Sequence, residues 1–398
     1  MTDAAAALEA AQPYMAALVA ELEAAGAITS RQWGAAFAAV PRHVFVPRWY
    51  EQETNGRGIA VWRMTHEAGG SSLARIYRDA TLVTALDPDT AQQVDRTAWT
   101  GVATSSSTLP SLMAGMLEDL SVEDGHRVLE IGTGTGYNAA LLCARLGEHL
   151  VYSVDIDPAL VETAQRRLSS IGYAPRLVEA DGQNRYPAGD QFDRIIATCS
   201  VPRIPGAWAE QTRPGGIIVA DVSLGIEGGL VRLAVNEEGD AIGRFTGTAG
   251  RFMAARTDAR TYQRRRRAQA APEKDTRPTS VTAADIRANY PFRLLLAFRI
   301  QNAEIVYYSD GAGGAMSLQV QRDGDWARVP LTGGETGLVS YGGKDLWAEV
   351  EAAWEWWTDA GRPSQDRFGY VREADGMAFV WYLPDGSRPT RTWLTDLV

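Results

Sequence analysis

The sequence VLEIGTGTGYN at residues 128–138 constrains the fold of this chain more than any other segment. An apolar run ends in three glycines at alternate positions, Gly132, Gly134 and Gly136. The run is typical of a buried parallel strand, and glycines permit a turn whose backbone a flat ligand can approach closely. Residues 139–146 then have the apolar spacing of a helix. Strand, glycine turn and helix together predict a site for a nucleotide-like ligand.

The glycine spacing discriminates between ligand classes. Dinucleotide sites use G-x-G-x-x-G, which brings a pyrophosphate to a helix N-terminus, whereas this chain has G-x-G-x-G. Glu130 stands two residues before the first glycine, and a carboxylate there favours a cationic ligand over a phosphate. An ordinary tight turn is the structural alternative. The neighbouring residues expected to face the same ligand are Thr133, Tyr137 and Asn138.

Strands and helices alternate after the glycine turn. We expect strands at 150–154, 176–180, 192–198 and 217–220, separated by helices at 139–146, 158–171 and 205–212. Such alternation predicts an α/β fold built on a doubly wound parallel sheet. A helix is also expected at 111–120, directly before the first strand.

Polar residues stand where these strands end. Asp155, followed by Ile156, closes the second strand about 20 residues beyond the glycines, where a carboxylate binds a ribose diol. A solvated loop acid is the alternative for Asp155. Asp181 and Gly182 end the third strand and are expected to flank an adenine, and Thr198 ends the fourth.

Composition and charge narrow the function classes. The formal net charge of −10 argues against a general nucleic-acid binder, and no apolar run is long enough to span a membrane. The first residues lack the pattern of a signal peptide. Two cysteines are too few for a disulfide scaffold, so we expect a reducing cytoplasm. No histidine or cysteine stands at metal-ligand spacing, so no metal site is expected.

The remaining segments suggest a division into domains. Helices are expected at 4–25 and 30–39, and loops near the site over 51–110. The basic run Arg264 to Arg267 lies in a polar stretch that we interpret as a linker, although it could contact an acidic partner. The predicted domains are N-terminal helices and loops (1–110), a ligand-binding core (111–256), a linker (257–282) and an accessory α+β domain (283–398).

The accessory domain contains short apolar runs between Asp-Gly and Gly-Gly turns. Strands are expected at 294–300, 303–309, 376–384 and 387–394, besides 229–235 and 250–256 at the end of the core. A helix over 345–359 places Leu346, Val350, Trp354 and Trp357 on one face. Seven of the twelve tryptophans fall at or after Trp326, which indicates core packing or, alternatively, an aromatic surface for a peptide.

Three segments together resemble protein L-isoaspartyl O-methyltransferases: AVPRHVFVP at 39–47, residues 127–147 and residues 192–219. IYRDATLV at 76–83 and ATSSS at 103–107 resemble two catalytic-loop segments more loosely. The resemblance implies the Rossmann-like fold of class I methyltransferases and S-adenosyl-L-methionine as the cofactor. Residues after 256 are expected to have no counterpart in the repair enzymes.

The resemblance also implies a chemistry and a site. A serine beside the methyl donor holds the substrate carboxylate in that family, which points to Ser106, with Ser105 and Ser107 as competitors and a flexible turn as the alternative. A carboxylate is ionised at pH 7 because its reference pKa is about 4, so no general base is required.

The stretches 48–76 and 84–103 are longer than in the repair enzymes. Our leading hypothesis is therefore methylation of a normal aspartate in a ribosomally made, cyclised precursor peptide, which then forms an aspartimide or isoaspartate. Repair of isoaspartyl residues in damaged proteins is the first alternative, and a non-catalytic cofactor-binding scaffold is the second. The sequence identifies neither the peptide nor the oligomeric state.

Overall fold

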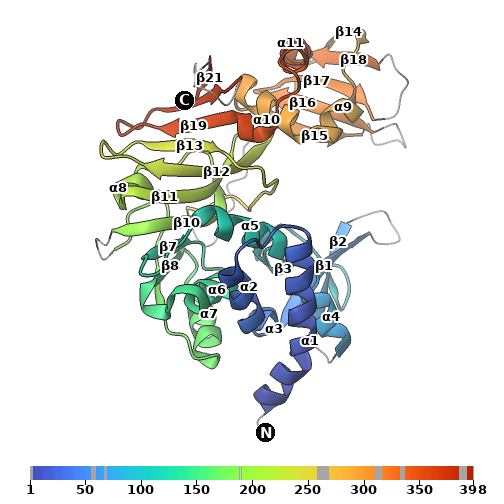
Figure 1. Ribbon diagram of the computed structural model, residues 1–398. Coiled ribbons are helices and arrows are strands. Elements are labelled where there is room, and N and C mark those ends of the chain that lie inside the picture. The colour runs from blue at the N-terminus through green and yellow to red at the C-terminus, as the bar shows by residue number, and fades with distance from the viewer. Residues whose placement is uncertain are drawn as a thin grey trace. The chain divides into compact units, whose positions relative to one another are not determined.

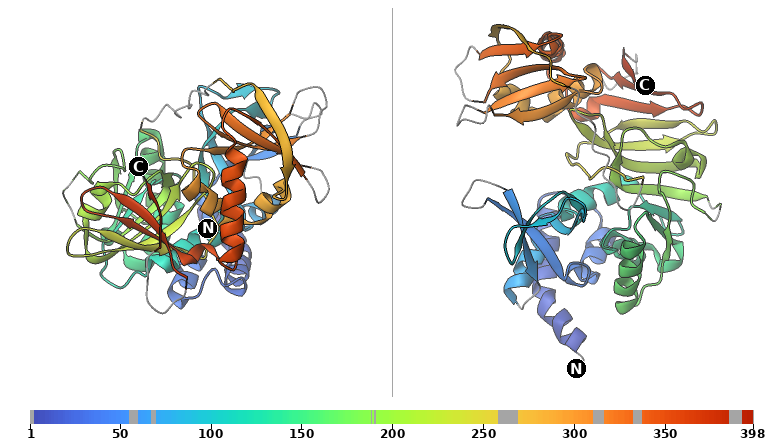
Figure 2. Two further views of the ribbon diagram at one scale, coloured as in Figure 1. Left: turned by 90° about the horizontal axis from the view of Figure 1, so that it is seen from above. Right: turned by 180° about the vertical axis from the view of Figure 1, so that it is seen from behind.

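The computed structural model describes residues 3–54, 60–66, 70–187, 189, 191–257, 269–309, 316–331, 337–384 and 392–397. The chain divides into two compact units (Figures 1 and 2). The first unit comprises 1–200, 205–220 and 252–263, and the second 201–204, 221–251 and 264–398. These units differ from the sequence-based domains, which stay a prediction. The Arg264 to Arg267 run lies outside the described residues.

A parallel sheet forms the centre of the first unit. Its strand order is β11-β10-β7-β8-β9, and β10, β7, β8 and β9 run parallel. Every residue of β7 and β8 is buried, as expected for strands covered on both faces. The strands are β7 (Val128–Ile131), β8 (Val151–Asp155), β9 (Arg176–Glu179), β10 (Phe192–Val201) and β11 (Thr212–Ser223). The helices between them are α6 (Tyr137–Leu146), α7 (Pro158–Ser170) and α8 (Gly206–Glu210).

Three helices before β7, Asp3–Ala24, Arg31–Ala39 and Pro110–Leu120, agree with the sequence-based expectations, whereas Arg42–Phe45 and Gly70–Ile76 were not expected as helices. Ser30 begins the second helix by accepting a hydrogen bond from the Trp33 amide, and Pro110 begins the helix before β7. The bounds are α1 (Asp3–Ala24), α2 (Arg31–Ala39), α3 (Arg42–Phe45), α4 (Gly70–Ile76) and α5 (Pro110–Leu120).

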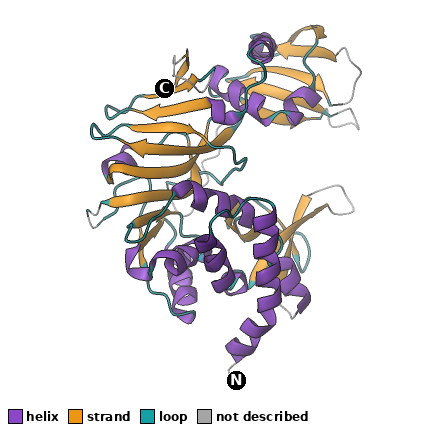
Figure 3. Ribbon diagram, in the orientation of Figure 1, coloured by secondary structure: helices purple, strands orange, loops and turns teal. Residues whose placement is uncertain are grey.

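Six strands between residues 48 and 107 form a sheet, where the sequence predicts loops over 51–110 (Figure 3). Its order is β4-β5-β2-β1-β3-β6. The strands were missed because they are short or half-exposed, which leaves weak apolar alternation. They are β1 (Arg48–Thr54), β2 (Ala60–His66), β3 (Leu82–Leu86), β4 (Gln92–Gln93), β5 (Ala98–Thr100) and β6 (Ala103–Ser107).

The second unit contains two groups of strands. One has the order β21-β20-β19-β13-β12 and the other β14-β18-β17-β16-β15. The strands are β12 (Gly228–Val235), β13 (Ala241–Phe245), β14 (Glu273–Thr279), β15 (Glu304–Tyr308), β16 (Ser317–Arg322), β17 (Asp325–Pro330), β18 (Gly337–Gly342), β19 (Phe368–Arg372), β20 (Ala378–Tyr382) and β21 (Thr392–Leu397). The helices are α9 (Ala283–Ala288), α10 (Tyr290–Arg299) and α11 (Leu346–Asp359).

Three expectations for the later part of the chain are wrong. Residues 294–299 of the strand expected over 294–300 lie in helix α10, because a buried apolar run does not distinguish strand from helix. Residues 273–279 of the expected linker form β14, a mostly exposed strand without an apolar pattern. A strand was expected over 250–256, but the β-pairing described for this segment is an isolated bridge between Ala254 and Ser200.

Tryptophans of the second unit contribute to its core. Trp347 is fully buried and Trp357 is 3% exposed, both on α11. The Phe292 ring lies 5.5 Å from the Trp357 ring, between centroids. Trp326 and Trp381 are also buried. This burial agrees with core packing as the role of most of these residues.

Candidate functional site

The three glycines after β7 adopt positive φ angles of 96°, 51° and 89° at Gly132, Gly134 and Gly136. A Cβ atom at Gly132 would lie 2.8 Å from Thr198 Oγ1, and one at Gly136 would lie 3.0 Å from Ala164 Cβ. At Gly134 it would meet nothing within 4 Å. The turn therefore packs closely at both ends and leaves its middle residue beside open space, where a ligand can approach.

Asp155 ends β8 next to this turn. Its Oδ2 accepts a hydrogen bond of 2.9 Å from the Gly134 amide, and its Oδ1 accepts one of 3.1 Å from the Asp157 amide. The side chain is buried, and this desolvation raises its pKa above the usual range. Each oxygen keeps a further lone pair, so the carboxylate can still accept from a hydroxyl. Ile156, the next residue, is half-buried.

Glu130 lies behind the turn. It is fully buried, and its two oxygens accept hydrogen bonds from Asn138 Nδ2 at 2.8 Å and Ser153 Oγ at 2.5 Å. Thr133 Oγ1 lies 2.6 Å from the same Ser153 oxygen. A side chain without exposed surface does not touch a ligand in this conformation. The observed contacts of Glu130 hold the turn, and its contact with a ligand stays a prediction.

Burial raises the pKa of Glu130 to about 7, despite the opposing hydrogen bonds from Ser153 and Asn138. Since the folded state holds this proton more tightly than the unfolded state, stability should fall as pH rises from about 4.5 to about 7. We expect Glu130→Gln to weaken this loss, because the variant has no proton to release there. Urea denaturation at both ends of this pH interval tests the prediction, and equal pH slopes for the two proteins would contradict it.

Two polar atoms beside the turn lack a partner within the described residues. Asn138 Oδ1 and the Tyr137 hydroxyl are buried and accept or donate no hydrogen bond there. The Tyr137 ring packs against Phe45, with ring centroids 5.8 Å apart, so its side chain faces the core. Asn138 is 8% exposed and follows the glycines directly. Its Oδ1 is an acceptor that a bound ammonium or hydroxyl group could satisfy.

The remaining predicted ligand-binding residues gather at the end of β7. Thr198 Oγ1 donates to the Gly132 carbonyl at 2.6 Å. A Cβ atom at Gly182 would lie 2.5 Å from Ile131 Cγ2, so this glycine also packs against β7. Asp181 Oδ1 accepts from the Gln183 amide at 2.9 Å. Strands β7, β9 and β10 thus bring these residues to one edge of the sheet, as the series predicts.

The three candidate serines lie on β6, which pairs with β3. Ser105 and Ser107 are buried: Ser105 Oγ accepts from Thr84 Oγ1 at 3.1 Å, and Ser107 Oγ accepts from Arg42 Nε at 3.3 Å. Ser106 is half-buried on the alternate face, and within the described residues its hydroxyl makes no hydrogen bond. Ser106 is therefore the candidate best placed to meet a substrate.

Arg42 connects segments that the sequence leaves unconnected. Its guanidinium is fully buried and donates to carbonyl oxygens at both ends of the 76–80 turn region and at the end of β6. The acceptors are Ile76, Arg78, Ala80, Ser107 and Thr108. Burial lowers the Arg42 pKa to about 10, so the group stays charged at neutral pH. The sequence analysis assigned no role to this residue.

Arg42 also joins the serine strand to the glycine turn. Its guanidinium carbon lies 6.0 Å from the centre of the Tyr137 ring, the first residue of α6. Phe45, on the same short helix as Arg42, would be 3.4 Å from a Cβ atom at Gly136. The segments 39–47, 103–107 and 132–138 therefore lie next to one another within the first unit.

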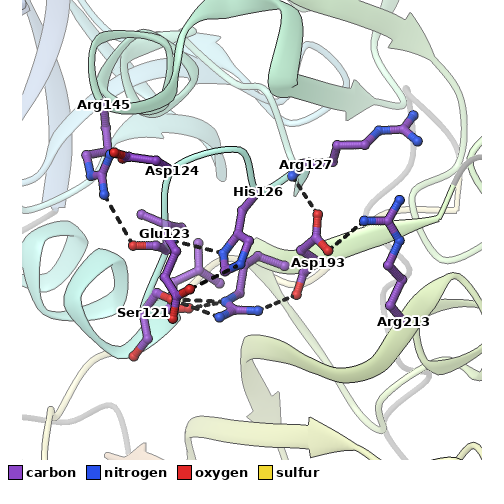
Figure 4. Close-up of polar contacts among 11 residues, drawn as sticks. Ser121, Glu123, Asp124, His126, Arg127, Arg145, Asp193 and Arg213 are labelled. Carbon is purple, nitrogen blue, oxygen red and sulfur yellow. Dashed lines mark hydrogen bonds and ion pairs between the residues drawn. The ribbon is translucent and has the colours of Figure 1, made fainter.

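A polar cluster fixes the opposite end of β7 (Figure 4). The Arg127 amide donates to Asp193 Oδ2 at 2.8 Å, and Arg213 Nη1 lies 2.7 Å from Asp193 Oδ1. Arg145 Nη1 also lies 2.6 Å from Asp124 Oδ1. These contacts tie the start of β7 to β10 and β11, so they have a structural role at a distance from the glycine turn along the strand.

The polar groups at the turn are carboxylate and amide oxygens, which accept hydrogen bonds, together with glycine amides. The acceptors suit a ligand with hydroxyl and cationic groups, such as S-adenosyl-L-methionine. Within the described residues, no group of three or more histidine, cysteine, aspartate or glutamate side chains could hold a metal ion.

Residues 75–253 match the family described as "Protein-L-isoaspartate(D-aspartate) O-methyltransferase (PCMT)". A curated protein-L-isoaspartate O-methyltransferase of Thermococcus onnurineus is 41% identical over 115 residues, which are 28% of this chain and 52% of the relative. One of Thermotoga maritima is 34% identical over 154 residues, 38% of this chain and 44% of the relative. The chain thus spans about half the length of the curated relatives it matches.

A solved structure named protein-L-isoaspartate O-methyltransferase aligns with a TM-score of 0.51 and 20% identity, and covers 92% of this chain and 98% of the other. The predicted Rossmann-like fold of class I methyltransferases is confirmed. Because the coverage extends far beyond residue 256, the expectation that this later part has no counterpart is wrong.

Among the described helices, none combines the length and apolar character needed to cross a membrane. Cys143 is buried and Cys199 is half-buried, and within the described residues neither forms a disulfide. The cytoplasmic location expected from the small number of cysteines stays a prediction.

Proposed function

We propose that this chain is an S-adenosyl-L-methionine-dependent carboxyl O-methyltransferase acting on proteins or peptides, because residues 75–253 match the protein-L-isoaspartate O-methyltransferase family. The observation that carries the proposal is the Arg42 contact set. Arg42 joins the serine strand to the glycine turn, which supports an acceptor-binding segment beside a cofactor-binding one.

The cofactor assignment rests on the groups at the turn. Asp155 is assigned to the ribose hydroxyls, and the unpartnered Asn138 Oδ1 to a cationic or hydroxyl donor. Asp181 and Gly182 are assigned to the edge of the adenine. When bound, S-adenosyl-L-methionine supplies an electrophilic methyl group on a sulfonium.

The chain's own residues have a positioning task. The substrate carboxylate is already ionised at pH 7, so no residue has to remove a proton from it. Ser106 donates a hydrogen bond to the carboxylate and fixes its orientation, while Arg42 holds the strand that carries this serine. His43, whose Nδ1 lies 2.8 Å from the Tyr77 hydroxyl, has its pKa lowered by burial and is not needed as a base.

We propose an isoaspartyl residue of a protein or peptide as the acceptor, because the relatives that match this chain are named for that substrate. Methylation of a normal aspartate in a ribosomally made, cyclised precursor peptide, with aspartimide formation, is the second candidate. It rests on the length of the stretches 48–76 and 84–103, which contribute β1, β2, β4 and β5 to the six-stranded sheet.

Paired peptides that differ in one residue test the acceptor. The purified chain is incubated with S-adenosyl-L-methionine and a peptide containing isoaspartate, or the same peptide containing aspartate. Mass spectrometry follows the gain of a methyl ester, and S-adenosylhomocysteine is quantified in parallel. Turnover on the isoaspartyl peptide supports the proposal. Turnover on aspartate alone, followed by loss of methanol to a succinimide, would favour the second candidate.

Asp155→Ala should weaken binding of S-adenosyl-L-methionine about tenfold or more, because hydrogen bonds to a charged acceptor contribute about 1.5–3 kcal/mol. Titration calorimetry measures the dissociation constant. Asp157→Ala is the matched control, since this neighbouring carboxylate caps α7 and is not assigned to the ribose. Equal dissociation constants for wild type and Asp155→Ala would refute the ribose assignment.

A further inference from the structure

A cavity of about 320 Å³ lies in the second unit, apart from the residues assigned to methyl transfer. It is lined from α9, α10, β15 and β16 (Figure 1). The lining residues are Ile226, Ile286, Arg287, Arg293, Ile305, Tyr307 and Leu318. This volume is at the lower end of small-ligand sites, so it suits one or two anchoring side chains.

Aliphatic side chains form part of the cavity lining, next to an exposed tyrosine. Ile286 and Leu318 are almost fully buried, whereas Tyr307 is 58% exposed. Tyr307 pairs with Leu318 across β15 and β16, and Ile305 lies two residues before it on the same face. An exposed tyrosine beside buried aliphatic groups is typical of a surface that packs against a partner's side chain.

The strand beside the cavity can pair with another chain. β15 is the outermost strand in the described part of its sheet, next to β16. The far side of such an edge strand presents backbone amide and carbonyl groups to an added strand. Extended peptides bind proteins in this way, with side chains entering pockets at alternate positions.

Positive charge marks the rim of the cavity. Arg287 is exposed and forms no ion pair with a described carboxylate. Arg293 is held in place: its Nε lies 2.8 Å from Glu227 Oε2, and its Nη1 donates to the Arg287 carbonyl at 2.7 Å. The chain has a net charge of −10 and therefore repels an acidic partner over most of its surface. The Arg287 guanidinium is a local positive charge that can attract such a partner to the cavity.

We propose that this cavity is a docking site for an extended acidic peptide segment. An apolar side chain of the segment enters between Ile286 and Leu318, a neighbouring carboxylate pairs with Arg287, and the backbone adds to β15. The proposal rests on the proposed function, because the bound segment is part of the substrate that is methylated. The segment lies elsewhere in that substrate than the modified residue.

Binding is measured with the full chain, by fluorescence anisotropy of a labelled peptide of alternating leucine and glutamate, and of a matched leucine and glutamine peptide. Arg287→Gln should raise the dissociation constant of the acidic peptide about tenfold and change that of the neutral peptide little. Arg244→Gln is the control, because it removes an exposed arginine of β13 that does not line the cavity. Equal effects of the two variants would overturn the proposal.

Two further readouts separate this proposal from the proposed function. Peptide binding needs no turnover, so absent methyl transfer would refute the function and leave the binding result intact. If methyl transfer occurs, Arg287→Gln should raise KM for an isoaspartyl peptide that carries the acidic segment, and leave KM and kcat for a short peptide unchanged. Light scattering tests whether a second copy of the chain occupies the cavity instead. If the measured mass doubles with concentration, and Arg287→Gln abolishes both this doubling and peptide binding, the occupant is a second copy and the proposal is overturned.

Discussion

Replacing Arg42 by methionine is expected to lower the free energy of unfolding by about 3–5 kcal/mol. The methionine fills much of the same volume but donates no hydrogen bond. The carbonyl groups of Ile76, Ala80 and Thr108 would then remain buried without this donor. Chemical denaturation measures the change, and loss of methyl transfer should accompany it, because the segment that carries Ser106 loses its anchor.

Two variants make this prediction specific. Arg42→Lys should lose part of the stability, since an ammonium retains the charge but reaches fewer carbonyl oxygens than the guanidinium. Arg78→Met is the matched control: its side chain is 57% exposed, so its free energy of unfolding should change by less than about 0.5 kcal/mol. Equal stability of Arg42→Met and Arg78→Met would contradict the structural role of Arg42.

The Arg42 contacts show what a single sequence does not provide. The segment 39–47 was noticed for its resemblance, yet the partners of Arg42 are backbone carbonyls. Every residue has a carbonyl group, so no residue pattern indicates which ones are left without a partner near a buried arginine. The complete burial of Glu130 could not be predicted for a related reason, because a motif gives its position along the strand and not its exposure.

The parallel strands of the first unit and the helices between them were predictable because they repeat one strong signal. Buried parallel strands such as β7 and β8 are continuous apolar runs, and glycine or proline marks the helices that follow. Strand β14 is mostly exposed and contains Pro278, so it has no such signal. Helix α10 was missed although Pro291 in its first turn and Arg299 at its end are helix signals. The apolar run of this segment was instead interpreted as a buried strand.

Ser106→Ala is expected to lower kcat/KM for methyl transfer at least tenfold while the dissociation constant of S-adenosyl-L-methionine stays unchanged. A hydrogen bond to a charged group contributes about 1.5–3 kcal/mol, and each 1.4 kcal/mol corresponds to a factor of ten in rate. Because the Ser106 hydroxyl makes no hydrogen bond within the described residues, its removal should cost little stability. Steady-state kinetics with an isoaspartyl peptide and calorimetry with the cofactor measure the two effects.

The neighbouring serines provide the control, since the alternation of β6 turns them to the other face. Ser105 accepts from Thr84 and Ser107 from Arg42, so alanine at either position should lower the free energy of unfolding by about 1 kcal/mol. Neither substitution should change kcat/KM as strongly as Ser106→Ala. If one of them produces the tenfold loss and Ser106→Ala does not, the substrate contacts the opposite face of β6, and Arg42 would then lie on the side of the strand that binds the acceptor.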